Sequence, residues 1–402
     1  MKILITGAGI GGLTAALCLS RSGHEVQVLE QASQFGEVGA GLQCGANAVR
    51  VLNYLGLSDE LKSVSVVPER IEFRDGLSGE ALYKMQLGDS YRKKFGASYF
   101  HIHRAHLHAI LVNALTQCSN VRLELNTLVQ SFHEKLDQVE VQLSDGRTVV
   151  ADCLVGADGV KSVVRTQLLG QISARFTGNV AWRGVVPAER LPDGFMDIVA
   201  SNFMGQGRHM VIYFLEQQRM VNFVGVVENQ SWRDDSWVAA APWAELKADF
   251  AGWHPTVQTV IDAVDKDKCF RWALYAHQPL SNWSSQRVTL LGDAAHATLP
   301  FMASGAAMAV EDARILQRSI DQTANELKTE SNADQLAQGL QLYQRNRMQR
   351  TAHIQNDSAR FGKLYHIPAG LPLKLAFKAL HVLGKRKERY LPEYDANTVE
   401  LI

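Results

Sequence analysis

Apolar residues follow two different spacings along this chain. Short apolar runs, typical of buried strands, occupy residues 2–6, 25–29, 121–125, 151–156 and 288–291. Helical spacing of apolar residues is found at residues 13–22, 47–55, 104–115, 304–320 and 333–361. Because predicted strands alternate with predicted helices, we expect an α/β fold with a parallel sheet.

The middle of the chain has strand character instead. Strands are expected at residues 180–187, 208–215, 219–227 and 270–275, with two helices within 242–264. Residues 71–87 alternate around Asp75-Gly76 and predict a hairpin of the same second sheet. This sheet is rich in aromatic residues, namely Trp182, Phe203, Tyr213, Phe214 and Phe223. They predict either the lining of a pocket for a flat ligand or an ordinary core.

The loop after the first strand carries a specific motif. Residues 7–12 read GAGIGG between a strand and a helix, and Glu30 ends the next strand. We expect Gly7 to make the turn, Gly9 to admit a pyrophosphate and Gly12 to let the helix pack closely. Glu30 would accept hydrogen bonds from ribose hydroxyls. The spacing predicts dinucleotide binding and leaves FAD and NAD both open.

Two later strands end in similar Gly-Asp turns. Asp158, in GADG, could face a ligand or cap the following helix. The stretch 288–313 passes from a strand through Gly292-Asp293 to a helix near Ser304, and its small residues let a ligand approach the backbone. The first turn of that helix offers free N–H groups and the positive end of its dipole. An ordinary strand-to-helix turn is the alternative.

Other polar stretches are less specific. Residues 36–45 are rich in glycine and predict either a loop close to a flavin ring or a flexible surface loop. A histidine cluster is formed by His101, His103, His106 and His108. No carboxylate or cysteine joins the cluster at ligand spacing, so we expect no metal site.

Composition excludes some classes of function. Lys plus Arg and Asp plus Glu number 41 each, so no basic field exists to gather nucleic acid. No signal peptide and no apolar run long enough to cross a bilayer is evident, which predicts a cytosolic protein. The five cysteines are scattered, as reduced thiols are. An apolar tail, residues 367–384, precedes the basic residues Lys385, Arg386, Lys387 and Arg389. It could touch a membrane surface, or pack on the body or on a partner of a homodimer.

With GAGIGG, Glu30, GADG and GDAAH, the chain resembles the single-component, class A FAD-dependent aromatic hydroxylases, in particular the salicylate hydroxylase and 3-hydroxybenzoate 6-hydroxylase branch. The resemblance implies the p-hydroxybenzoate hydroxylase fold. In this fold a discontinuous Rossmann-type FAD domain, here residues 1–70, 98–170 and 277–364, is interrupted by a β-rich substrate domain, 71–97 and 171–276. A helical tail, 365–402, follows.

The resemblance also implies site residues. FAD would contact Gly9, Gly11, Gly12, Glu30, Gln31, Gly41, Arg104, Leu128, Asp158, Asp293, Gly305, Ala306 and Ala307. His209 and Tyr213 fall on one face of a strand, since side chains alternate with a period of two residues. They would orient or deprotonate a phenol, although polar groups satisfied in a β core are an alternative. Pro300, with Leu299, Phe301 and Met302, would form a wall beside the flavin.

Three positions depart from relatives. Phe301 stands where several salicylate and hydroxynicotinate hydroxylases carry His, Pro300 where the 3-hydroxybenzoate enzyme has Gln, and Ser304 where many have Gln. The resemblance therefore leaves the substrate open within small phenols and aromatic acids.

The implied reaction is hydroxylation of an activated aromatic ring. NAD(P)H reduces the flavin, dioxygen adds at its C4a atom, and the resulting hydroperoxide gives one oxygen to the ring. Two alternatives use the same fold: an epoxidase or quinone-pathway hydroxylase acting on a larger apolar substrate, and an escort protein that only binds. A monomer or a homodimer is compatible with the sequence.

Overall fold

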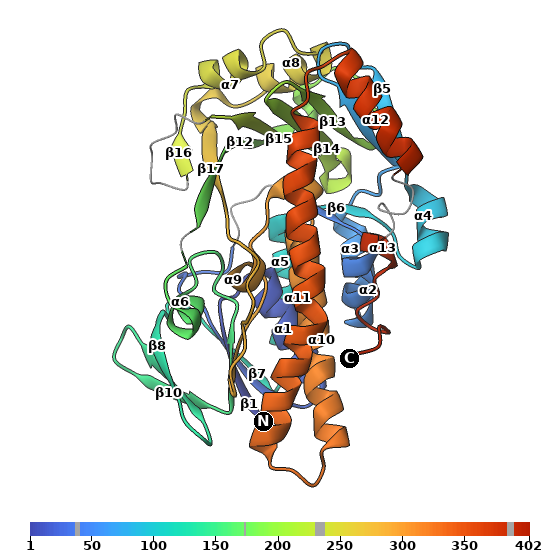
Figure 1. Ribbon diagram of the computed structural model, residues 1–402. Coiled ribbons are helices and arrows are strands. Elements are labelled where there is room, and N and C mark those ends of the chain that lie inside the picture. The colour runs from blue at the N-terminus through green and yellow to red at the C-terminus, as the bar shows by residue number, and fades with distance from the viewer. Residues whose placement is uncertain (37–40, 173, 230–237, 384–389) are drawn as a thin grey trace.

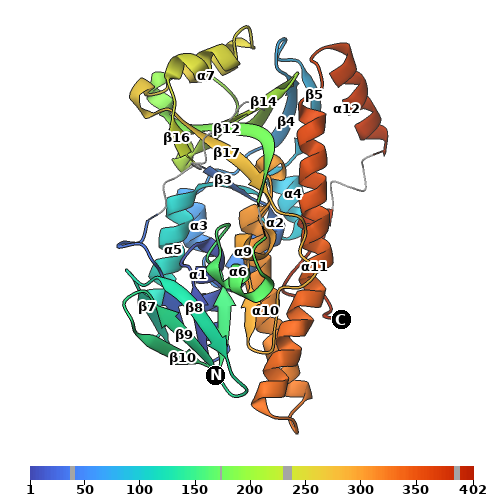
Figure 2. The ribbon, with the colours of Figure 1, turned by 60° about the vertical axis from the view of Figure 1, so that its left-hand side comes forward.

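The computed structural model describes residues 1–36, 41–172, 174–229, 238–383 and 390–402. Two sheets lie one above the other, and the long helix α11, Asn332–Tyr365, runs alongside from the lower sheet to the upper one (Figure 1). The same arrangement is seen from a second side in Figure 2.

The lower sheet is parallel, as the sequence predicts. Its strands, in spatial order, are β18 Val288–Leu290, β11 Cys153–Gly156, β1 Lys2–Thr6, β2 Glu25–Leu29 and β7 Val121–Glu124. Among the covering helices, α1 Ile10–Arg21 packs against α5 Arg104–Thr116 and α10 Gly305–Glu326. In the register, Thr6 lies opposite Gly156, and Gly156 opposite Leu290. The loops that follow these three strands therefore meet at one edge of the sheet.

The upper sheet is mixed and has eight strands. In spatial order they are β16 Val238–Ala240, β17 Phe270–Ala276, β12 Arg175–Pro187, β15 Met220–Glu228, β14 Arg208–Leu215, β13 Val199–Gly205, β4 Arg70–Asp75 and β5 Ala81–Gln86. Helices α7 Trp243–Asp249 and α8 Pro255–Asp262 cover one of its faces. The predicted hairpin, strands and helix pair are confirmed.

The aromatic residues of this sheet separate by face. Trp182, Phe203, Phe214 and Phe223 are buried in the core under α7 and α8. Strand alternation turns Tyr213 to the opposite face. Of the two interpretations of these residues, an ordinary core therefore holds for four of them and the lining of a pocket for Tyr213.

Smaller elements complete the fold. A three-stranded antiparallel sheet contains β8 Val129–Glu134, β9 Val139–Leu143 and β10 Thr148–Ala151, and a two-stranded one contains β3 Gly41–Cys44 and β6 Phe100–His103. The remaining α-helices are α2 Ala46–Tyr54, α3 Ser58–Val64, α4 Gly88–Phe95, α6 Val163–Leu169, α9 Asp293–His296, α12 Leu371–Leu383 and α13 Tyr390–Glu393. Short 3-10 turns are η1 Ala188–Arg190, η2 Glu216–Gln218, η3 Lys266–Lys268 and η4 Pro300–Met302.

The C-terminal tail packs on the body of the protein. Leu373 and Phe377 of α12 are buried in a cluster that includes Phe73. The backbone N–H of Gly370 donates to Asp75 Oδ2 at 2.6 Å, and Lys374 lies 2.5 Å from Glu80. The basic residues expected after this helix, 385–387 and 389, lie outside the described residues. No helix in the described part of the chain is long and apolar enough to cross a membrane.

Candidate active site

The three glycine-rich turns converge as expected from the order of the strands. Gly9 and Gly11 from the first turn, Ala157 and Gly159 from the second, and Gly292 and Asp293 from the third line one cavity of about 470 Å³. Gly41 and Gly45, from the glycine-rich residues 36–45, line this cavity as well. Residues 37–40 of that stretch lie outside the described residues.

The glycines of the first turn differ in what they allow. Gly7 has a φ of +97°, and a Cβ on Gly12 would lie 2.0 Å from the carbonyl oxygen of Gly7. Both positions therefore need glycine for the fold itself. A Cβ on Gly9 would meet nothing within 4 Å, so Gly9 leaves open space in the cavity.

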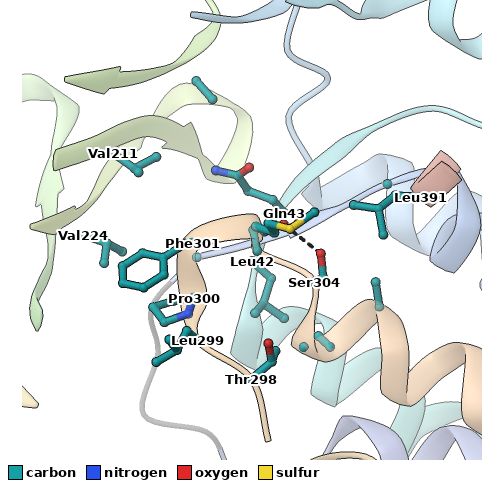
Figure 3. Close-up of a pocket in the computed structure, with 18 of the residues that line it drawn as sticks. Leu42, Gln43, Val211, Val224, Thr298, Leu299, Pro300, Phe301, Ser304 and Leu391 are labelled. Carbon is teal, nitrogen blue, oxygen red and sulfur yellow. Dashed lines mark hydrogen bonds between the residues drawn. The ribbon is translucent and has the colours of Figure 1, made fainter. Parts of the chain in front are cut away.

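Two helices direct their N-terminal ends at this cavity. Gly9 is the N-cap of α1 and Ser304 that of α10, and neither N-cap makes a side-chain hydrogen bond to its helix. No acidic residue occupies either first turn. Ser304 Oγ instead donates to the Met302 carbonyl at 2.9 Å (Figure 3). The first-turn N–H groups, including those of Gly305, Ala306 and Ala307, are therefore available to an electronegative ligand.

A buried ionic network fixes the third turn. Asp312 on α10 accepts hydrogen bonds from the Gly292 N–H at 3.0 Å, His296 Nε2 at 2.5 Å and Arg347 Nε at 2.6 Å. Burial alone would raise the pKa of Asp312, but the charges of His296 and Arg347 outweigh it and lower the pKa to about 2. The network thus holds the backbone immediately before Asp293 in place.

A second branch of the network reaches the cavity. Glu311, beside Asp312, lies 2.8 Å from Arg347 and 2.8 Å from Arg350. It also accepts a hydrogen bond from Asn47 Nδ2 at 2.6 Å, and Asn47 lines the cavity. Helices α2, α10 and α11 are therefore tied together beneath the site.

Five of the expected cofactor residues do not line the cavity. They are Gly12, Glu30, Gln31, Leu128 and Asp158. The Glu30 carboxylate accepts the backbone N–H groups of Ala8 at 2.7 Å and Ala32 at 2.8 Å, and so closes the first turn. Gln31 and Leu128 are both exposed. They lie close to the first turn, because the Thr127 N–H donates to the Glu30 carbonyl at 2.8 Å. Contacts of these five residues with a cofactor remain predictions.

Asp158 does what the alternative interpretation proposed. Its carboxylate accepts hydrogen bonds from Ser162 Oγ at 2.5 Å and from the N–H groups of Val163 at 2.8 Å and Val164 at 3.2 Å. It therefore caps α6, and its neighbours Ala157 and Gly159 face the cavity.

The wall of the cavity comes from the segment before α10. Leu299, Pro300, Phe301 and Met302 all line the cavity. Pro300 and Phe301 point toward Val211 and Val224 of the upper sheet (Figure 3). The tail contributes as well, since Leu391 of α13 lies at the opposite side.

The floor is one face of the eight-stranded sheet. A continuous cross-strand row of cavity residues runs through Arg183, Val224, Val211, Asn202, Phe73 and Tyr83. His209 and Tyr213 flank Val211 on β14 and also line the cavity, as the strand period predicts. The chamber is mostly apolar with a few polar groups, as sites for small aromatic ligands are.

His209 is bonded on one side only. Its Nδ1 lies 2.9 Å from Nε2 of His366, and no hydrogen bond to its Nε2 is found within the described residues. Burial, with the neighbouring His366, holds the pKa of His209 well below its usual range. His209 is therefore neutral at physiological pH.

Tyr213 is enclosed more tightly. A Cβ on Gly41 would lie 2.7 Å from the Tyr213 hydroxyl, so only glycine fits above it. Burial raises the pKa of Tyr213. A tyrosine that keeps its proton is suited to donate a hydrogen bond and not to act as a base.

Arg183 is the cation of the floor. No hydrogen bond or ion pair is found for Arg183 in the described residues, and its guanidinium lies 5.8 Å from the centre of the Trp272 ring. Burial lowers the pKa of Arg183. Arg183 is half-buried, and a cation held partly out of water without an anionic partner is unfavourable, which makes the site complementary to an anion.

Arg104 lies at the cavity, as expected of a residue that contacts FAD, and two of the clustered histidines have structural positions. Arg104 is the first residue of α5 and lines the cavity. His103 caps that helix by accepting the Ala105 N–H at 3.2 Å, and His101 is buried. In the described residues no three His, Cys, Asp or Glu side chains gather as a metal site would require.

The profile of the family described as "FAD binding domain" matches residues 1–355. The chain belongs to this family. Among the relatives of this FAD-binding protein, 6-hydroxynicotinate 3-monooxygenase of Bordetella bronchiseptica is 36% identical over 360 residues, which cover 89% of this chain and 90% of that one. A 3-hydroxybenzoate 6-hydroxylase of Polaromonas naphthalenivorans is 35% identical over 367 residues, 91% and 88% of the two chains.

Solved structures of similar fold point to the same family. A salicylate hydroxylase substrate complex superposes with a TM-score of 0.82 at 25% identity, covering 98% of this chain and 96% of that one. HpxO of Klebsiella pneumoniae, complexed with FAD and uric acid, gives 0.80 at 26% identity, covering 98% and 93%. The p-hydroxybenzoate hydroxylase-like fold and the FAD cofactor predicted from the sequence are confirmed, and the protein is an FAD-dependent monooxygenase. The names of the two relatives, a monooxygenase and a hydroxylase, describe enzymes.

Some residues of this flavoprotein's site were missed by sequence reasoning. Arg183 could have been found, because neighbouring strand residues point to opposite faces of a sheet. Arg183 follows the aromatic residue Trp182 in a predicted strand, so the two lie on opposite faces. His366 and Leu391 carry no comparable signal, since each lies in the tail far from any motif. Only three-dimensional packing brings His366 against His209 and Leu391 to the cavity.

Proposed function

We propose that this protein hydroxylates a small aromatic acid that carries a phenolic hydroxyl, using FAD, NAD(P)H and dioxygen. The observation that carries the proposal is the Nε2 of the neutral His209, which has no hydrogen bond within the described residues. It lies in an apolar cavity next to the expected cofactor residues. Relatives named for hydroxynicotinate and hydroxybenzoate act on compounds of this kind. A cytosolic location and a monomeric or homodimeric state belong to the same proposal.

The residues present fit FAD. Gly9 leaves space where the pyrophosphate would approach the first turn of α1. Asp293 would hold the ribityl chain, and the N–H groups of Gly305, Ala306 and Ala307 would face the pyrimidine side of the ring. The bound flavin supplies reduction by NAD(P)H and the activation of dioxygen.

The protein's own residues act on the aromatic ring. His209 would accept the phenol proton at Nε2, which makes the ring carbon more nucleophilic, and general base catalysis of this kind contributes about 10²–10⁴ in rate. Tyr213 would orient the phenol oxygen by donating a hydrogen bond. Pro300 and Phe301 would hold the ring against Val211 and Val224 and exclude water from the reacting atoms.

Arg183 favours an acid over a neutral phenol. Its guanidinium is the cation of the floor and lacks an ion pair within the described residues. A carboxylate on the substrate would neutralise it, and hydrogen bonds to charged groups are worth about 1.5–3 kcal/mol.

The test is a screen of hydroxybenzoates and hydroxypyridine carboxylates with the purified yellow protein. We expect at least one of them to stimulate NAD(P)H oxidation and to yield a product with one added oxygen. Stimulated oxidation that gives only hydrogen peroxide with every compound, or no stimulation at all, would contradict the proposal.

A further inference from the structure

Two residues outside the cavity connect His209 to the surface. His366 directly follows α11, and Glu228 ends β15. His209 Nδ1 lies 2.9 Å from His366 Nε2, and His366 Nδ1 lies 2.8 Å from Glu228 Oε1. His209 is 2% exposed, whereas the Glu228 side chain is 54% exposed. The chain of hydrogen bonds therefore leads from the cavity to solvent.

The exposed end fixes the proton on each ring. The carboxylate of Glu228 is an acceptor and has no hydrogen to donate. His366 must therefore donate from Nδ1 to Glu228 and accept at Nε2. His209 must then donate from Nδ1, which leaves the lone pair of its Nε2 free.

The surroundings keep both rings neutral. Burial lowers the pKa of His366, although Glu228 acts in the opposite direction. The other rings in contact with His209 are Phe301 at 5.4 Å and Tyr365 at 5.2 Å. Burial raises the pKa of Tyr365, so its hydroxyl stays protonated. The strands paired with β14 at His209 present Val226 and Met204, which do not titrate.

We propose that His366 and Glu228 form a proton relay that holds His209 in the tautomer able to accept a phenol proton and carries that proton to solvent. The proposal rests on the proposed function. The phenol O–H bond breaks as a bond to His209 Nε2 forms, the Nδ1 proton of His209 passes to His366 Nε2, and the Nδ1 proton of His366 passes to Glu228 and then to water. The relay runs in reverse when the oxygen of the hydroxylated ring regains a proton, and both tautomers are restored.

Glu228→Gln gives the sharpest test, because the side chain is largely exposed and keeps its shape. The amide N–H₂ can donate to His366 Nδ1, which would reverse both tautomers and place a proton on His209 Nε2. In the holoenzyme, ¹⁵N NMR of labelled histidines should show His209 protonated at Nδ1 in the wild type and at Nε2 in the variant. The same tautomers in both proteins would overturn the proposal.

A kinetic test uses the same variant. Glu228→Gln should slow hydroxylation of a neutral phenol about tenfold or more at pH 7, with flavin reduction by NAD(P)H unchanged. The defect should shrink toward the wild-type rate with a fluorinated analogue whose phenol is already ionised, because no base is needed. An equal defect with both substrates would contradict the relay.

Glu80→Gln is the matched control, since it removes an exposed carboxylate, paired with Lys374, from the hairpin loop between β4 and β5 without touching His209. It should leave the histidine tautomers and the hydroxylation rate as in the wild type. The tautomer measurement needs no substrate, so it decides the relay even if the wild-type protein hydroxylates no phenol, which would overturn the proposed function instead.

Discussion

The edge of the five-stranded sheet offers the cavity mostly backbone, whereas the floor on the eight-stranded sheet offers it side chains. At the edge, Gly9 leaves room for a ligand, and Gly305 presents a first-turn N–H group of α10 to the cavity. On the floor, His209 and Arg183 provide a lone pair and a charge. Backbone surfaces suit an invariable cofactor, and side chains adapt a site to one substrate. The two regions should therefore respond differently to substitution.

The largest effect should come from His209→Ala, on the floor. It removes the expected base, so hydroxylation should slow by about 10²–10⁴ while flavin reduction changes little. Stopped-flow measurement of both steps checks this. If both steps slowed equally, His209 would be part of the scaffold and the contrast between floor and edge would be lost.

Arg347→Met breaks the network beneath the edge. Leaving Glu311 and Asp312 buried without this partner should lower the free energy of unfolding by about 3–5 kcal/mol. Denaturant unfolding measures it. Arg345→Met, an exposed position on the same helix, is the control and should change stability by less than about 0.5 kcal/mol. Similar losses in the two variants would show that the network does not support the edge.

A pair of alanine substitutions separates fold from ligand at the edge. Gly12→Ala places a methyl group against the Gly7 carbonyl and should destabilise the protein by about 1–3 kcal/mol or more. Gly9→Ala meets no atom, so stability should be kept while the ratio of flavin to protein falls. Full flavin content in Gly9→Ala would mean that the cofactor does not approach this turn.

Arg183→Leu tests the charge of the floor. The preference for an aromatic acid over its uncharged amide, measured as a ratio of kcat/KM values, should fall about tenfold to a hundredfold. Flavin content should not change. An unaltered preference would assign the anion site elsewhere.

The smallest effect concerns pH. Because the pKa of His209 is lowered, the ring loses its free lone pair only when the pH falls through this lowered value. The rate constant of hydroxylation should therefore stay level from pH 8 to below about 6.5, the ordinary histidine value. A decline that begins above pH 7 would show a histidine with a normal or raised pKa.

The same contrast explains what the sequence could predict. The three turns were found because glycine spacing and buried strands are local signals, and the order of parallel strands brings their ends together. Glu30 and Asp158 were assigned to ligands, yet their carboxylates bond nearby N–H groups, a choice that local sequence does not decide. His366 was missed because its contact with His209 joins residues 157 positions apart.

The most direct measurement is a crystal structure of the yellow holoenzyme with a hydroxylated aromatic acid bound. We expect FAD along the edge formed by Gly9, Asp293 and Gly305, and the phenol oxygen within hydrogen-bonding distance of His209 Nε2. A flavin bound away from these residues, or an aromatic ring whose hydroxyl faces away from His209, would contradict this expectation.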